Sequence, residues 1–253
     1  MELNEFVKEL NSSLDEKRMV VFTGAGLSTA SGIPDFRGKN GLYNNLTDKS
    51  NEDNPEEILS HEYFIKNPKK FYIFFREKLI NDVKPNLMHE VIADLQKEGY
   101  ISGVITQNID GLDTMAGTKD VIELHGNANN FYCMNCKKKY SLNDIKEMDI
   151  VPKCKCGGII RPDIVLYEES LDWNALWSSQ EKIGNAKNVL VIGSSLKVNP
   201  AAGLLHDFVV EKRRNKSKKL FIINQGETDY DYFADYKYDG DVIEVAKKIK
   251  KLK

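Results

Sequence analysis

Five short apolar segments are spread along the chain, and each is followed by a polar or glycine-containing loop. Continuous apolar runs of this length, rich in β-branched and aromatic residues, predict buried strands. Because helical stretches separate most of them, the pattern predicts an α/β fold built on a Rossmann-like, doubly wound parallel sheet. Ligands bind at the carboxyl ends of the strands in such sheets, so the five loops should meet at one crevice. The predicted strands are residues 19–22, 103–106, 121–124, 189–192 and 220–223.

Helical patterns account for much of the remaining chain. Residues 5–15 have apolar residues at helical spacing and predict a short amphipathic helix. A second predicted helix, with one apolar face, begins at Pro85. The stretch 41–84 is charged and aromatic and is predicted to be mostly helical. The last helix, at about 241–252, ends in a basic tail that we interpret as a solvated face.

Composition and charge narrow the class of protein. The 253 residues carry a net charge of −2, with an isoelectric point near 6.2, so no overall field attracts nucleic acid or an anionic membrane. No apolar run approaches the roughly 18 residues of a spanning helix. The start of the chain is acidic and lacks the basic region of a signal peptide. We therefore expect a cytoplasmic protein with no membrane partner and no specific nucleic-acid partner.

The cysteines occur as two close pairs, Cys133-x-x-Cys136 and Cys154-x-Cys156, separated by seventeen residues. This spacing is typical of a zinc ribbon, in which four thiolates fill a tetrahedral shell and make the metal structural. The second pair is one residue shorter than usual, which tightens the chelate. The alternatives are four reduced cysteines without a metal, or a redox Cys-x-x-Cys that would leave the second pair unexplained.

A glycine-rich loop follows the first predicted strand, over residues 23–38. Gly24 and Gly26 allow a tight turn and a close approach to a ligand, and the small residues after them suit a helix start that favours phosphate. The loop continues into Pro-Asp-Phe-Arg at 34–37, which an ordinary dinucleotide site does not need. The acidic residue that usually binds a ribose hydroxyl about twenty positions later is not evident.

With these motifs in place, the chain resembles the sirtuins, the family of NAD-dependent protein-lysine deacylases, and in particular a bacterial-type single-domain member. The resemblance implies a Rossmann-like NAD-binding domain formed by residues 1–40, 85–130 and 161–253. It also implies a helical insertion at 41–84 and a zinc-binding module at 131–160. The matching segments are residues 24–37, 106–112, 125–127, 161–165, 193–196, Asn224 and the two cysteine pairs.

The resemblance further implies residue roles. NAD would be a co-substrate and zinc a structural ion held by Cys133, Cys136, Cys154 and Cys156. An acetylated protein or peptide would pair with a rim that includes Val165, Tyr167, Glu168 and Val198. The implied cofactor-binding residues are Gly24, Ala25, Gly26, Thr29, Asp35, Phe36, Arg37, Gln107, Asn108, Ile109, Asp110, Gly193, Ser194, Ser195, Asn224, Gln225, Asp241 and Val242.

The implied reaction transfers the acyl group from lysine to ADP-ribose and releases nicotinamide and O-acetyl-ADP-ribose. Its first step joins the acyl oxygen to the ribose and depends on positioning, since the nucleophile is weak. A base must then take a proton from a ribose hydroxyl, and His125 suits this role because imidazole titrates near working pH. Asn108 is implied to hold the ribose and an ordered water, and Phe36 to close behind departing nicotinamide. A lone histidine in a loop is more often structural, but the surrounding motifs favour catalysis here.

Three positions depart from the family pattern. Glu168 replaces the usual glycine after the aromatic residue of the rim, which would favour basic residues in the substrate. Asp113 stands where histidine is common. Sirtuins that prefer acidic acyl groups carry a Tyr-x-x-Arg pair in the helical insertion, whereas here Phe75 stands three positions after Tyr72. We therefore expect acetyl or other apolar acyl chains rather than succinyl.

Two other functions remain open from the sequence. A mono-ADP-ribosyltransferase or NAD hydrolase could use the same fold, and it would release nicotinamide without an acyl-lysine peptide. A non-enzymatic module whose zinc ribbon binds protein or nucleic acid is the alternative from another class. The lysines near the cysteines permit that reading, whereas the sparse aromatic residues and the acidic net charge oppose it.

Overall fold

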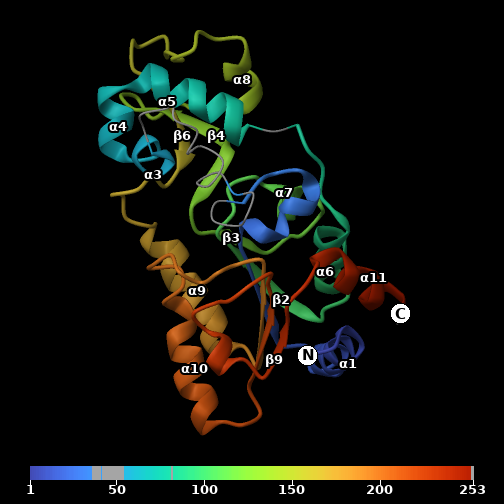
Figure 1. Ribbon diagram of the computed structural model, residues 1–253. Helices are drawn as coiled ribbons and strands as arrows, with labels where there is room; N and C mark the ends of the chain where they lie inside the picture. Colours follow the sequence, from blue (N-terminus) through green and yellow to red (C-terminus); the bar gives the residue numbers. More distant parts are fainter. Residues whose placement is uncertain (36–40, 42–53, 81, 252–253) are drawn as a thin grey trace.

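A computed structural model of the chain describes residues 1–35, 41, 54–80 and 82–251. Its centre is a six-stranded sheet in which every adjacent pair is parallel (Figure 1). The strand order, β3-β2-β1-β7-β8-β9, reverses direction next to β1, as in the doubly wound dinucleotide-binding fold. The strands are β1 (Met19–Thr23), β2 (Ile101–Thr106), β3 (Val121–Glu123), β7 (Asn188–Ile192), β8 (Lys219–Ile223) and β9 (Tyr236–Tyr238).

Helices cover both faces of this sheet, which explains why its strands are almost continuously apolar. Along β7, Leu190 and Ile192 pack under one helical layer, while Val189 and Val191 pack under the other. The two layers lie on opposite sides of the sheet in Figure 1. The first layer consists of α1 (Leu3–Leu14), α6 (Leu87–Lys97) and α11 (Val242–Lys251), and the second of α9 (Trp173–Asn185) and α10 (Leu204–Arg214).

A smaller antiparallel sheet, in the order β5-β4-β6, carries the cysteines. Short helices pack against it around an aromatic core in which Phe71 stacks on Phe75 and Phe75 meets Phe131 edge-on. The strands are β4 (Gly126–Cys133), β5 (Lys139–Ser141) and β6 (Ile160–Ile164). The helical elements are α3 (Pro55–Ile58), α4 (His61–Lys66), α5 (Pro68–Phe74), the π-turn η3 (Phe75–Leu79) and α8 (Leu142–Lys146). We call these strands and helices the small module.

The start of α6 joins this framework to the glycine-rich loop. The Asn86 side chain accepts hydrogen bonds from the amides of Met88 and His89, and it donates to the carbonyl of Leu27 at 2.8 Å. His89 completes the cap by accepting the Asn86 amide at Nδ1, and burial lowers its pKa to about 4. His89 is therefore a neutral capping residue.

All five predicted strands are present, so the predicted α/β class is confirmed. Two features differ from expectation. β9 was not predicted, and the helix expected after the first strand is replaced by two 3₁₀ turns, η1 (Ala25–Leu27) and η2 (Thr29–Ser31). The other short elements are α7 (Leu112–Met115) and η4 (Asp231–Phe233). The division into domains at the stated residue boundaries stays a prediction.

The described part of the chain contains no helix that is both long enough and apolar enough to cross a membrane.

Candidate active site

The site lies where the strand order reverses, between the loops that follow β1 and β7. The amide of Gly24 donates to the carbonyl of Ile192 at 3.0 Å, and the amide of Gly26 donates to the carbonyl of Gly193 at 2.8 Å. A Cβ on Gly193 would lie 2.2 Å from the amide nitrogen of Leu27, and Gly193 has a φ of 63°. These glycines therefore allow two loop backbones to touch, and this contact shapes the floor of the site.

Replacing Gly193 with alanine should lower the free energy of unfolding by more than about 1 kcal/mol, because alanine disfavours that φ and its Cβ overlaps backbone. Thermal unfolding at fixed protein concentration measures the change. Gly184→Ala in α9 is the matched control, since a Cβ there meets nothing within 4 Å. That control should be neutral or stabilising by up to about 1 kcal/mol. Equal destabilisation of both variants would contradict this account.

A cavity of about 520 Å³ opens above this floor, at the carboxyl ends of the large sheet. Every residue within the described ranges that was predicted to bind cofactor or substrate, together with His125, lines it. Phe36 and Arg37 lie outside the described residues. The segment after β6 forms the opposite wall with Val165, Tyr167 and Glu168. The strand-end loops contribute Gly24, Ala25, Gly26, Thr29, Asp35, Gln107, Asn108, Ile109, Asp110, Gly193, Ser194, Ser195, Val198, Asn224, Gln225, Asp241 and Val242.

Two hydrogen bonds fix the carboxylate of Asp110, which lines this cavity. Its carboxylate accepts hydrogen bonds from the Ser28 hydroxyl at 2.7 Å and from the Leu112 amide at 2.8 Å. Asn108 donates from its side-chain amide to the Gly24 carbonyl at 3.1 Å and to the Ser28 hydroxyl at 3.3 Å. Burial raises the pKa of Asp110. The result is a fixed acceptor in a poorly hydrated position, suited to a ligand amide.

His125 lies between the two walls, at the end of β3. Its Nδ1 is 2.8 Å from the Gln107 carbonyl oxygen, and because a carbonyl only accepts, the proton resides on Nδ1. Burial lowers the pKa of His125, so the imidazole is neutral at pH 7 and Nε2 carries a lone pair. The ring is therefore oriented by the backbone and ready to accept a proton at Nε2.

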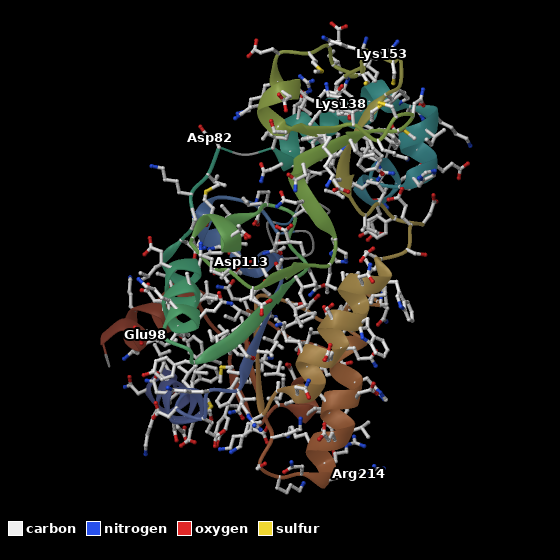
Figure 2. The ribbon with its side chains drawn as sticks, turned by 180° about the vertical axis from the view of Figure 1, so that it is seen from behind. Asp82, Glu98, Asp113, Lys138, Lys153 and Arg214 are labelled. Atoms are coloured by element: carbon white, nitrogen blue, oxygen red, sulfur yellow. The ribbon has the colours of Figure 1, made fainter. Side chains whose placement is uncertain are left out.

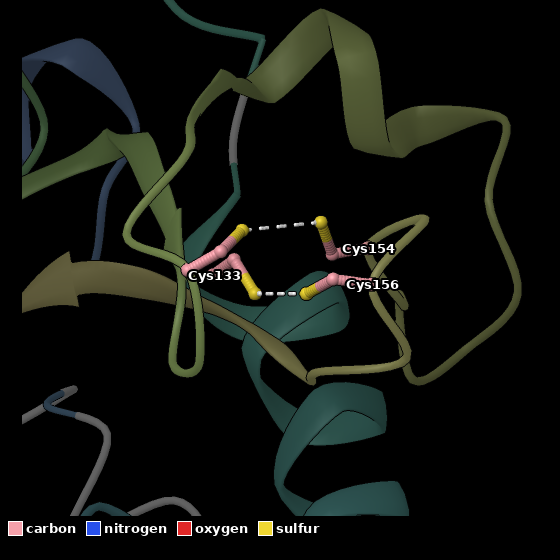
Figure 3. A group of neighbouring side chains, drawn as sticks. Cys133, Cys154 and Cys156 are labelled. Carbon is pink, nitrogen blue, oxygen red and sulfur yellow. Dashed lines mark hydrogen bonds between the residues drawn. The ribbon is translucent and has the colours of Figure 1, made fainter.

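The four cysteine sulfurs of the small module lie within 4.8 Å of one another. Cys133 faces Cys156 at 3.5 Å between sulfurs, and Cys136 faces Cys154 at 3.6 Å, as the dashed lines in Figure 3 mark. These distances are far longer than a disulfide, which measures about 2.05 Å. Four sulfurs placed 2.3 Å from a zinc ion would lie about 3.8 Å apart, so the cluster fits a closed tetrahedral site.

The surroundings of the cluster favour the thiolate at two of the cysteines and hold the short pair in place. Backbone amides lower the pKa of Cys133 and of Cys154, the latter to about 6. A Cβ on Gly158 would lie 2.7 Å from the Cys133 sulfur, so only glycine lets the second pair approach the first. Lys138 lies over the Tyr140 ring, whose hydroxyl donates to the Cys154 sulfur at 3.1 Å. Figure 2 shows Lys138 and Lys153 at the end of the small module away from the large sheet.

Comparison with known proteins agrees with this geometry. The Sir2 family model matches residues 24–200, which is most of the chain. The chain belongs to the Sir2 family. It is 44% identical over 239 residues to an NAD-dependent protein deacetylase of Clostridium acetobutylicum, covering 93% of this chain and 94% of that protein. A Thermotoga maritima NAD-dependent protein deacetylase is 41% identical over 255 residues, covering 98% and 97%.

Solved Sir2 structures agree over the same length. One, a Sir2 variant with a deacetylated p53 peptide and 3′-O-acetyl ADP ribose, superposes with a TM-score of 0.86 at 40% identity, covering 100% of this chain and 98% of that one. Another, Sir2 with a p53 peptide and NAD⁺, gives a TM-score of 0.84 at 40% identity, covering 97% and 98%. The predicted fold, with a large parallel sheet and a small cysteine-bearing sheet, is therefore the Sir2 fold.

An ion pair between buried Arg161 and partly buried Glu169 fixes the wall at 165–168 of this Sir2 site. Glu169 receives two hydrogen bonds from Arg161, at 2.6 and 3.0 Å, and one from the Leu166 amide at 2.9 Å. Although burial opposes it, Arg161 lowers the pKa of Glu169 to about 2. The amide and carbonyl of Tyr167 are already paired with Leu59 and His61. A substrate strand at this wall would therefore use backbone groups other than those of Tyr167.

The substitution of Glu168 for glycine has a local explanation. Glu168 adopts a φ of 74°, the left-handed region where glycine is favoured. Its carboxylate accepts the Glu62 amide at 3.1 Å, which ties the wall to the start of α4. The side chain thus offsets part of the backbone strain and still leaves negative charge at the rim of the cavity.

Some residues around the cavity of this Sir2 protein were not predicted. Leu59 and Leu79 reach it from the helical insertion, and Ser28 supports it by bonding to both Asp110 and Asn108. The site was predicted from the loops at the carboxyl ends of the strands, and the two leucines lie in the helical insertion. Their contribution to the cavity could therefore not be predicted from a single sequence. Ser28 did have a signal, because it lies within the glycine-rich motif one turn after Gly24.

Asp113 is a buried carboxyl group on α7 (Figure 2), close enough to Asp110 for their charges to interact. It is 3% exposed and contacts the hydroxyls of Thr23 and Thr106, while its Oδ1 has no partner within the described chain. Burial, reinforced by the negative charges of Asp110 and Glu123, raises its pKa to about 7. The position where the family commonly has histidine therefore holds a neutral acid at mildly acidic pH.

The raised pKa of Asp113 makes the free energy of unfolding depend on pH. The unfolded chain loses the proton near pH 4 and the folded chain near pH 7, so stability falls as pH rises between them. A shift of that size corresponds to up to about 4 kcal/mol. We expect Asp113→Asn to gain thermal stability over the parent protein as pH is raised from 5 to 8. A difference between the two proteins that is independent of pH would contradict the assignment.

Proposed function

We propose that this chain is an NAD-dependent protein-lysine deacetylase. One observation carries the proposal: a neutral imidazole with a fixed tautomer, His125, lines the cavity that joins the dinucleotide-type loops to the wall at 165–168. The cavity has two kinds of wall, which suits a reaction between two substrates. The family relationship, and Sir2 structures that contain a peptide with NAD⁺ or an acetylated ADP ribose, support the same activity.

The strand-end loops would bind NAD. The glycines at 24, 26 and 193 let the loops after β1 and β7 touch, since a Cβ at any of them would overlap the neighbouring loop. Ser194, Ser195 and Asn224 line the cavity beyond this contact. Asp110, with the Ile109 backbone, would hold the carboxamide. When bound, NAD supplies an ADP-ribosyl group that accepts the acetyl group as nicotinamide leaves.

His125 would act as the general base. Gln107 fixes its Nδ1 proton, so Nε2 is the atom that takes a proton from a hydroxyl in the cavity. The low pKa keeps Nε2 free at pH 7 without prior deprotonation. Asn108 is anchored by Gly24 and Ser28, which makes it a rigid neighbour for a sugar or an ordered water. The products are deacetylated lysine, nicotinamide and O-acetyl-ADP-ribose.

Zinc would be structural, because four cysteines fill a tetrahedral shell and leave no position for substrate. A reducing compartment keeps such thiols available for a metal, so we place the protein in the cytoplasm. The substrates would be acetylated proteins or peptides.

An apolar acyl chain is the expected substrate. Tyr72 is fully buried in the small module, where its hydroxyl donates to the Ile160 carbonyl, and it therefore does not form part of an acid-binding pair. Leu59, Leu79 and Val165 line the cavity instead. We expect kcat/KM for an acetyl-lysine peptide to exceed that for the matched succinyl-lysine peptide by at least about tenfold, since burying an unpaired carboxylate is costly. Faster desuccinylation would contradict this.

The experiment that tests the function is nicotinamide release with and without an acetyl-lysine peptide. Release that requires the peptide and matches lysine product one for one supports the deacetylase. Release without peptide would instead indicate a hydrolase, and transfer of ADP-ribose to a protein would indicate a transferase.

A further inference from the structure

Both tryptophans of the chain lie exposed on one helix. Trp173 and Trp177 are 73% and 61% exposed, and they are four residues apart on α9. Residues with this spacing share one face of a helix. The opposite face of α9, through Ser179 and Ile183, is buried against the large sheet and α10. Large exposed aromatic side chains in one place usually mark a binding surface, and tryptophan is enriched among residues that dominate binding energy.

This face is continuous with the rim of the cavity. The segment 164–169 and Leu171 line the cavity, Asp172 caps α9, and Trp173 follows directly. The N-terminal end of α9 is its end closest to the small module in Figure 1. The helical rise separates the two tryptophan Cα atoms by about 6 Å. An extended chain leaving the cavity near Leu171 would therefore reach Trp177 within roughly four residues.

The charge along this path is negative. Glu168 lies at the cavity rim, Asp172 begins the helix, and Glu181 is exposed one turn beyond Trp177. Lys182, the basic residue of α9, is paired with Asp120 at 2.6 Å and is only partly exposed. Indole faces attract lysine and arginine side chains, and the flanking carboxylates add to this attraction.

We propose that Trp173 and Trp177, with Asp172 and Glu181, form a docking site for a basic segment of the acylated protein, outside the cavity that receives the acyl-lysine. The site deepens the proposed deacetylase function and rests on it. It would recognise lysine or arginine residues several positions away from the modified lysine. It gives the enzyme a preference among protein substrates that the cavity alone does not supply.

Tryptophan fluorescence tests this directly, because the chain has no tryptophan elsewhere. Three peptides are needed: a short acetyl-lysine peptide with about two flanking residues on each side, a long one with about ten, carrying lysine and arginine, and the long one with these replaced by glutamine. We expect the long basic peptide to shift the emission of the wild-type protein. The short and the glutamine peptides should leave it unchanged.

Kinetics give a second readout. We expect the variant with Trp173→Ala and Trp177→Ala to raise KM for the long basic peptide about tenfold or more, with kcat and the short-peptide KM unchanged. Tyr232→Ala is the matched control, since Tyr232 is 89% exposed and lies outside α9. It should change none of these values.

Two outcomes would overturn the docking site: no emission shift with the long basic peptide, or equal KM values for long and short peptides in the wild-type protein. An emission shift that depends on protein concentration alone, with dimers in solution, would assign the face to self-association and overturn it as well. Failure of the deacetylase function would be distinct, since no peptide would then be turned over while the emission shift persisted.

Discussion

The variant His125→Ala should lose nearly all deacetylation, with kcat for an acetyl-lysine peptide lowered by roughly 1,000-fold. The reason is geometric as well as chemical. The imidazole is neutral because burial lowers its pKa, and its proton is fixed on Nδ1 by the Gln107 carbonyl. Alanine removes the lone pair on Nε2 and leaves only water to take the proton. Steady-state assays at saturating NAD and peptide measure the loss.

The matched control is His206→Ala, because His206 is exposed on α10 and is not among the cavity-lining residues. That variant should keep wild-type kcat. His206→Ala should keep the wild-type melting temperature, and His125→Ala should stay folded with a melting temperature lowered only by the lost hydrogen bond to Gln107, which separates catalysis from folding. The acid limb of the parent enzyme's pH–rate profile should have its midpoint below that of a free imidazole, since burial lowers the pKa of His125. Near-normal turnover by His125→Ala would remove this residue from the mechanism.

Removal of the metal should disrupt the small module. Cys136→Ala leaves three thiols, and we expect its zinc content to fall from about one ion per chain to near zero, with deacetylation lost and the melting temperature lowered. Structural zinc contributes on the order of 10 kcal/mol to small zinc modules, so the three-stranded sheet should not survive intact. The wall at 165–168 follows β6 of that sheet, which links the metal to the activity.

Lys155→Ala is the control for this change, because Lys155 is an exposed residue between Cys154 and Cys156. Its zinc content and activity should match those of the parent protein. Metal analysis, thermal unfolding and deacetylation are measured on the same samples, prepared without chelator. A Cys136→Ala protein that is fully active and free of zinc would contradict the structural role.

Much of the large sheet could be predicted from the sequence, because its strands are buried on both faces. Residues 19–22 and 189–192 are continuous apolar runs, which is the pattern of a strand covered on both faces. β9 was missed because Tyr236-Lys237-Tyr238 is a short edge strand of half-buried residues with a charge at its centre. Such a segment gains its structure from pairing with β8 rather than from its own pattern.

The cavity could be predicted in large part for a different reason. Parallel strands end at one edge, so residues as distant as Gly24, Asp110 and Asn224 had to converge. The exact support of the site could not be predicted. Asp113 is buried, and the backbone of Tyr167 is paired with the helical insertion. Both features depend on packing between segments that are far apart in the chain. The exposure of both tryptophans could not be predicted either, because large apolar residues are normally expected in the core.

Mass spectrometry of the products formed from NAD and an acetylated peptide by the zinc-loaded protein tests the central claim most directly. The account predicts deacetylated peptide, nicotinamide and O-acetyl-ADP-ribose in equal amounts. Free acetate with NAD left intact, or ADP-ribose formed while the peptide keeps its acetyl group, would contradict it.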